Sequence, residues 1–103
     1  MLLAAQTTAP EVAERRHERH GKDEIILTVY RAADGGYTHS IQCRLGRLVR
    51  SAFPHQTFAT PLAAKRAACA LLESWLAHNP AARKRAAIFE LRSADQPEFD
   101  FFL

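Results

Sequence analysis

The chain of 103 residues contains little cysteine and little glycine, and it has no long apolar run. Its two cysteines, Cys43 and Cys69, form no Cys-x-x-Cys pair and lack zinc-ligand spacing, which excludes a disulfide scaffold and a zinc finger. No apolar stretch approaches the length that spans a bilayer, and the apolar start lacks the basic residues of a signal peptide. We therefore expect reduced thiols in a cytoplasmic protein that neither enters a membrane nor holds a metal ion.

The motifs of common enzyme classes are also absent. The sequence shows no glycine-rich phosphate loop, no Gly-x-Ser-x-Gly and no paired-carboxylate catalytic site. His39 and Cys43 share one face of a predicted strand, but a separation of about 13 Å is too long for a nucleophile and its base. We predict no catalytic residue, no cofactor and no small-molecule substrate. An enzyme would require a polar pocket that gathers such groups from elsewhere.

Positive charge, in contrast, is concentrated in the middle of the chain. Residues 31–92 contain ten basic and three acidic residues, a net charge of +7, whereas residues 1–30 carry −1 and residues 93–103 carry −3. Segregated positive charge favours a polyanionic partner. We therefore predict a non-catalytic module that binds nucleic acid, DNA before RNA. The candidate contacts are Gln42, Arg44, Arg47, Arg50, Lys65, Arg66, Arg83, Lys84 and Arg85.

Local patterns predict one α+β domain over residues 23–103, after a flexible or weakly helical segment over residues 1–22. In that first segment, Pro10 is expected to begin a polar helix that ends near His20. Strands are expected at residues 24–31, 37–45, 47–53 and 87–92, and one long helix at residues 60–78. The expected architecture is β-β-β-α-β, a three- to five-stranded, mainly antiparallel sheet with the long helix packed on one face.

Two segments give the clearest signals for structure. From Tyr37 to Leu45, apolar residues alternate with Thr38, Ser40, Gln42 and Arg44, which predicts a strand with one buried and one wet face. Thr60-Pro61 is typical of a helix start, because threonine caps free amides and proline fits the first helical position. The buried side of that helix is expected to contain Ala64, Ala68, Leu71, Leu72 and Trp75.

Residues 25–78 resemble the arm-type DNA-binding domain of phage-type integrases. The similar motifs are Gly35-Gly36-Tyr37, Arg44-Leu45-Gly46-Arg47, Thr57-Phe58-Ala59-Thr60 and the alanine-rich start Ala63-Ala64-Lys65. The resemblance implies that the sheet face away from the helix enters the major groove. It would place Thr38, Ser40, Gln42 and Arg44, with Arg47 or Arg50, against DNA.

The helix over residues 60–72 is also similar to the closing helix of double-stranded-RNA-binding domains. That family has lysines directly after the Ser/Thr, where this chain has Pro61 and Leu62. An alternative function is a homodimeric protein-interaction domain that uses a sheet edge or the aromatic C-terminus. Its partner-binding residues would be Phe99, Phe101, Phe102 and Leu103, within a stretch that resembles the peptide bound by bacterial sliding clamps. These phenylalanines would otherwise belong to a last strand of the core.

Overall fold

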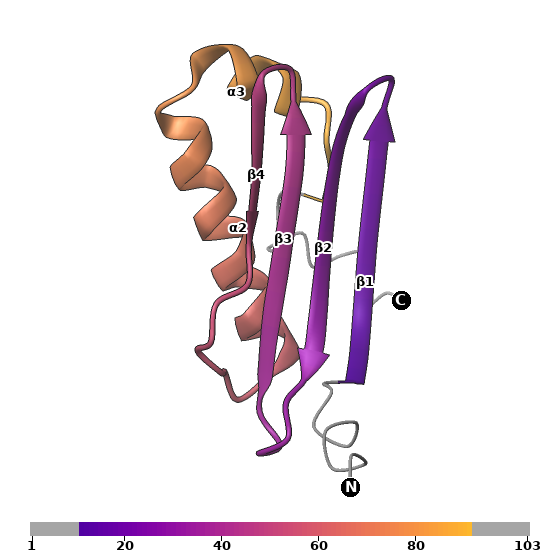
Figure 1. Cartoon of the computed structure of the whole chain (residues 1–103), viewed down its shortest axis with the longest axis vertical. Helices are drawn as coiled ribbons and strands as arrows, with labels where there is room; N and C mark the ends of the chain where they lie inside the picture. The colour runs from indigo at the N-terminus through magenta and orange to yellow at the C-terminus, as the bar shows by residue number, and fades with distance from the viewer. Residues whose placement is uncertain (1–10, 92–103) are drawn as a thin grey trace, which may run out of the picture.

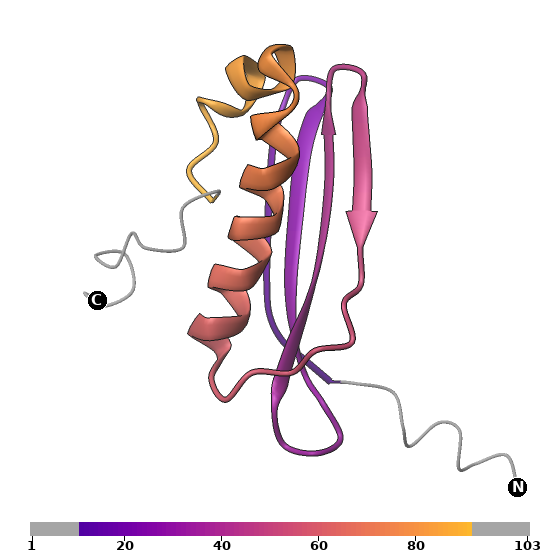
Figure 2. The same ribbon diagram turned by 90° about the vertical axis from the view of Figure 1, so that its left-hand side faces the viewer.

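The computed structural model describes residues 11–91, in which four consecutive strands precede two helices (Figure 1). The elements are β1 (Glu11–His20), β2 (Asp23–Arg31), β3 (Tyr37–Leu45), β4 (Leu48–Ala52), α2 (Pro61–Ala77) and α3 (Pro80–Ala86). Each strand pairs antiparallel with the next, so the order in the sheet is β1-β2-β3-β4. Helix α2 lies along one face of the sheet (Figure 2). The predicted α+β architecture, with a long helix on one face of an antiparallel sheet, is confirmed.

The two central strands supply the sheet's half of the core. Their alternating residues face α2 and are almost inaccessible to solvent, in the cross-strand pairs Ile25–Cys43, Leu27–Ile41 and Val29–His39. The predicted alternation in β3 is therefore correct, and Cys43 and Cys69 are buried and not joined in a disulfide. Burying a side chain of the size of leucine or isoleucine stabilises the fold by about 1.5–3 kcal/mol, so these rows fix the register.

Helix α2 begins and ends where the sequence predicts. The Thr60 hydroxyl oxygen accepts a hydrogen bond from the Ala63 amide at 3.1 Å, and Pro61 occupies the first turn. The buried side of the helix consists of Ala64, Lys65, Ala68, Cys69, Leu72 and Leu76, while Leu71 and Trp75 are partly buried against the core. The small alanines let the helix axis approach the sheet closely.

Tight turns join the strands at one end of the sheet. Gly46 has φ of +65° in the turn between β3 and β4, a left-handed conformation that glycine adopts without strain. A Cβ atom at this position would also lie 2.7 Å from Arg85 Nε, so the Arg85 side chain would have to shift to admit one. Gly46 therefore brings the β3–β4 turn against the last helix.

The predicted N-terminal helix is wrong, because Glu11–His20 forms edge strand β1. The segment has no apolar stripe, but its polar residues acquire partners on other elements. Glu14 Oε2 lies 3.2 Å from Lys65 Nζ on α2, and His17 hydrogen-bonds to Glu24 on β2. These partners lie far away in sequence, so the local pattern does not show them. A charged edge strand also resists pairing with other chains.

The predicted strand at residues 87–92 and the β-β-β-α-β order are also wrong. Residues 80–86 form α3, and residues 87–91 continue as turns and bends. Phe89 and Leu91 are buried, as the alternation indicates, but they pack on the helix-facing side of β1 rather than joining the sheet. The Phe89 ring meets His20 edge-on at 4.6 Å between ring centroids. The observed order is β-β-β-β-α-α.

The aromatic C-terminus, Phe99 to Leu103, lies outside the described residues, as does Arg92. Neither helix of the described part is long and apolar enough to cross a membrane.

Candidate nucleic-acid interface

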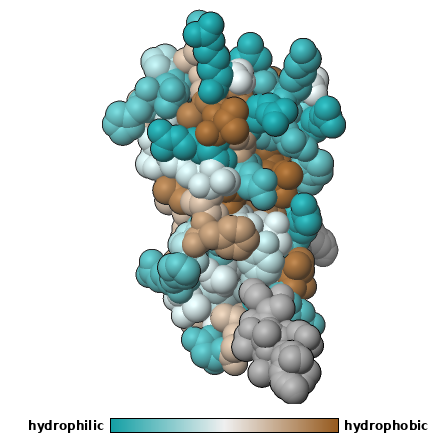
Figure 3. All heavy atoms as spheres, viewed as in Figure 1, coloured by the Kyte–Doolittle hydropathy of each residue, from teal (hydrophilic) through white to brown (hydrophobic). Residues whose placement is uncertain are grey.

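The sheet face opposite α2 is not covered by any other element of the described chain, and we call it the open face (Figure 3). Cross-strand pairing defines its rows, because directly opposite residues point to the same side. One row joins Arg15, Thr28 and Ser40, and the next joins His17, Ile26, Gln42 and Ser51. The row nearest the β1–β2 and β3–β4 turns joins Arg19, Glu24, Arg44 and Val49.

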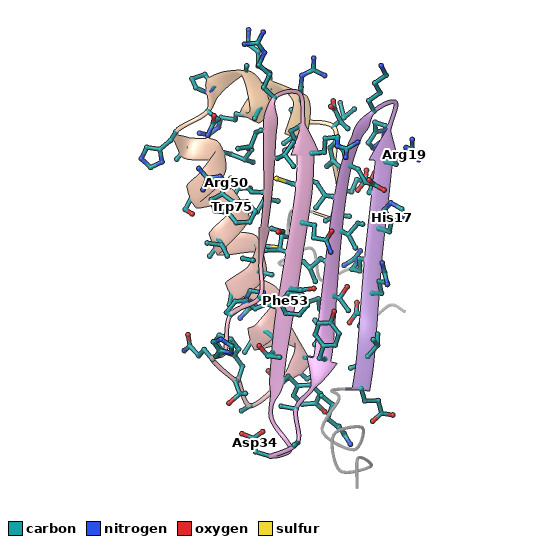
Figure 4. All side chains as sticks on the ribbon, viewed as in Figure 1. His17, Arg19, Asp34, Arg50, Phe53 and Trp75 are labelled. Carbon is teal, nitrogen blue, oxygen red and sulfur yellow. The ribbon has the colours of Figure 1, made fainter. Side chains whose placement is uncertain are left out.

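Two stacked aromatic rings lie on the open face. The rings of Tyr30 and Phe53 have centroids 5.8 Å apart and planes inclined by 27°. Phe53 is 63% exposed, and Figure 4 shows it in front of the sheet. The Tyr30 hydroxyl lies 3.3 Å from Ser40 Oγ, and Ser40 is only 2% exposed beneath it. The predicted DNA contact Ser40 is therefore beneath the rings rather than on the surface.

Next to the rings, a shallow depression of about 210 Å³ crosses β2, β3 and β4. Its lining consists of apolar residues, uncharged polar residues and charged residues: Ile26, Cys43 and Val49, then Gln42 and Ser51, then Glu24, Arg44 and Arg50. Gln42 and Arg44 are exposed, so both predicted contacts remain available to a partner. Thr38, in contrast, donates its hydroxyl hydrogen to the Pro54 carbonyl at 3.1 Å.

Basic residues from separate segments meet at the end of the molecule where β1 and β3 finish and α3 lies (Figures 1 and 4). We call this region the cationic end and define it by Arg19, Lys22, Arg44, Arg47, Arg83, Lys84 and Arg85, all exposed. Arg47 and Arg85 line one depression of about 300 Å³ between the β3–β4 turn and α3. The two basic clusters, far apart in sequence, are thus neighbours in the fold.

The acidic residues at this end are largely engaged in internal contacts. Asp23 is 9% exposed, accepts from Arg85 Nη1 at 3.0 Å and from the Gly46 amide at 3.1 Å, and so fastens the turn to α3. Glu18 accepts from the amides of Glu90 and Leu91 and pairs with His20. Partial burial raises the pKa of Glu18, but these hydrogen bonds outweigh it and lower the pKa below its ordinary value of 4.5.

Three predicted contacts lie away from this end or point elsewhere. Lys65 is buried at 8% exposure and paired with Glu14, so it belongs to the interior. Arg66 is on α2, the layer behind the open face. Arg50 is exposed and pairs with Cys43, which places its side chain on the side of β4 toward α2, although the residue also lines the depression across β2, β3 and β4.

Sequence reasoning missed Arg15, Arg19, Lys22, Tyr30 and Phe53. Arg15 and Arg19 were missed because their segment was assigned to a helix, although their alternation with Glu14, Arg16 and Glu18 is compatible with a strand. Tyr30 lies near the end of β2 and Phe53 directly follows β4, and only the pairing of β2, β3 and β4 brings their rings together.

The buried titratable groups face the core rather than the open face. Burial lowers the pKa of His39 below 6.5, and its Nδ1 atom has no hydrogen-bond partner within the described chain. Burial likewise raises the pKa of Cys43 above 9.0, which keeps it a thiol. Within residues 11–91, no three His, Cys, Asp or Glu side chains gather as metal ligands. The exposed side chains of the open face instead include cations, the Gln42 amide, the Phe53 ring, His17 and apolar Val49.

No protein-family model matches this chain, and the comparisons with curated proteins and with solved structures also gave no match.

Proposed function

We propose that this domain is a small nucleic-acid-binding module, preferring DNA to RNA, that contacts phosphates through the cationic end. The observation that carries the proposal is the meeting of basic residues from four segments: the end of β1 with its turn, the end of β3, the β3–β4 turn and α3. Half or more of protein–DNA hydrogen bonds go to phosphate and sugar, and basic side chains supply many of them. Of the contacts predicted from the sequence, the proposed interface keeps Gln42, Arg44, Arg47, Arg83, Lys84 and Arg85. It adds Arg19 and Lys22.

Internal neutralisation would weaken this proposal, but little of it occurs at this end. Asp23 is held by Arg85 and the Gly46 amide, and Glu24 is held by His17. The side chains of Arg47, Arg83 and Lys84 are exposed, and α3 projects them beside the β3–β4 turn. Arg85 is bonded to the largely buried Asp23 through Nη1 but is itself 53% exposed, so its remaining N–H donors can contact a phosphate while that ion pair is kept.

Salt dependence tests the proposal. The affinity of the full chain for a labelled DNA duplex would be measured by fluorescence anisotropy over a series of salt concentrations. Each phosphate contact contributes about 0.9 to the slope of log affinity against log salt. Arg47→Gln should therefore weaken binding and reduce the slope by about 0.9.

The matched control is Arg31→Gln, which also removes one positive charge. Arg31 is at the end of β2 far from the cationic end, about 26 Å along the strand from Asp23. This variant should leave both affinity and slope close to those of the parent chain. Absence of retention of any DNA or RNA at low salt would overturn the proposed function.

A second candidate, a homodimeric protein-interaction domain, is favoured by the outer edge of β4, which pairs with no other strand within residues 11–91. Exposed Val49 and Phe53 lie on or next to β4. Sedimentation at increasing protein concentration tests it: a monomer throughout would contradict the homodimer, and a tight dimer insensitive to nucleic acid would favour it over the first proposal.

A further inference from the structure

The rings of Tyr30 and Phe53 form an ordered platform rather than two loose side chains. Tyr30 is positioned by the contact of its hydroxyl with Ser40 Oγ at 3.3 Å. Phe53 is followed by Pro54, whose carbonyl accepts from Thr38 on β3 at 3.1 Å. The backbone beside Phe53 is thus tied to the neighbouring strand, and the ring is presented to solvent at 63% exposure.

We propose that the open face binds single-stranded DNA, with a base stacked on the Phe53–Tyr30 platform and the backbone directed toward the cationic end. This inference rests on the proposed function and specifies its ligand. An exposed aromatic face suits an unstacked base, because every base has a π-face and stacking on protein rings is a general means of binding single strands. In a duplex, the faces of internal bases are already occupied by their neighbours.

The charges of the open face are complementary to a phosphate backbone. Arg15 lies in the row of Thr28 and Ser40, directly beside the platform, and Arg44 lies four residues beyond Ser40 on β3, about 13 Å away. The acidic residue in these three rows is Glu24, which is paired with His17. A short stretch of extended backbone could therefore contact cations on both sides of a stacked base.

The depression next to the platform favours DNA over RNA. Its lining combines the Gln42 amide and the Ser51 hydroxyl with the apolar side chains of Ile26 and Val49, beside Arg44 and the Glu24 carboxylate that pairs with His17. The amide and hydroxyl can hydrogen-bond the edge of an unpaired base. Ile26 and Val49 offer apolar contact to the methyl group of thymine, which uracil lacks.

The test compares Phe53→Leu with the parent full-length chain. Leucine keeps an apolar side chain but removes the ring. Because Phe53 is exposed, the substitution should change the stability of the fold only slightly. We expect Phe53→Leu to weaken binding of a short oligothymidine roughly tenfold, and Phe53→Tyr, which retains a ring, to restore it. Affinity for a duplex of equal length should change little. The matched control, Ile88→Ala, truncates an apolar side chain of similar exposure, 60%, beyond α3.

The arms of this experiment separate the two proposals. If Phe53→Leu leaves oligothymidine binding unchanged while salt-dependent binding persists, the platform is overturned and the proposed function stands. Tighter binding of oligouridine than of oligothymidine would overturn the DNA preference. A dimer that buries Phe53 and excludes oligothymidine would overturn the platform in favour of a second copy of the chain. Failure to bind any nucleic acid at low salt would overturn both proposals.

Discussion

The ion pair between Lys65 and Glu14 provides a quantitative test of how β1 is held in place. Lys65 Nζ lies 3.2 Å from Glu14 Oε2, and the two side chains are 10% and 36% exposed, respectively. The perturbation is Glu14→Gln, which leaves the size of the side chain nearly unchanged but removes the negative charge. The Lys65 ammonium group then remains buried without a negative partner.

The solvent exposure of Glu14 and of Lys65 determines how much the substitution lowers the free energy of unfolding. Breaking a fully buried ion pair from one side costs about 3–5 kcal/mol, whereas a surface pair is worth about 0–1 kcal/mol. Because water reaches Glu14 but hardly reaches Lys65, we expect Glu14→Gln to lower the free energy of unfolding by about 1–2 kcal/mol. Lys65→Met should cost less than about 0.5 kcal/mol or be stabilising, because it removes a costly buried charge and leaves a carboxylate that water can solvate.

Urea unfolding, followed by circular dichroism and by the fluorescence of partly buried Trp75, measures both variants and the double variant Glu14→Gln/Lys65→Met. In the double variant the lysine charge is gone, so the loss caused by Glu14→Gln should largely disappear. Equal destabilisation by the two single variants, or an unchanged stability of Glu14→Gln, would refute this reasoning. DNA affinity should be the same for Lys65→Met and the parent chain, since Lys65 is committed to the interior.

Two further predictions concern pH. His39 is 2% exposed and burial lowers its pKa, so the unfolded chain takes up a proton that the native state excludes. Stability should be complete above the ordinary pKa of 6.5 and fall by up to about 1.4 kcal/mol per pH unit below it, and His39→Phe should flatten that fall in urea midpoints measured across this range. An equally steep fall in the variant would contradict the assignment to His39. The lowered pKa of Glu18 gives stability that is present above 4.5 and lost as the pH falls through the lowered value. Glu18→Ala should therefore cost about 1–2 kcal/mol at neutral pH, with the difference from the parent chain disappearing in acid; a difference that persists in acid would argue for a packing effect instead.

The elements that sequence reasoning predicted correctly carry their signal in neighbouring residues. Strand β3 alternates apolar and polar side chains, and α2 combines the Thr60-Pro61 start with small and large apolar residues at helical spacing. Both patterns follow from backbone geometry alone, because a strand repeats every two residues and a helix every 3.6. For the same reason, the buried positions of these elements were largely recognisable.

The errors arose where distant partners determine the structure. β1 contains few strand formers, and its place at the sheet edge depends on Lys65, Glu24 and the amides after α3. Phe89 and Leu91 alternate in burial because the sheet, β1 and α2 enclose them, although they pair with no strand. Local periodicity cannot distinguish such a buried crossing segment from a strand.

The sequence by itself determined that a charge-segregated chain forms an antiparallel sheet with one long covering helix, since periodicity, caps and turns are local properties. Only the tertiary structure decided which cations meet, because the meander and the placement of α3 bring Arg47 beside Arg85 while Lys65 turns inward to Glu14. The same pairing of strands placed Tyr30 against Phe53. Contacts between residues far apart in sequence depend on strand register and helix packing, which are set by burial of the whole core rather than by any short segment.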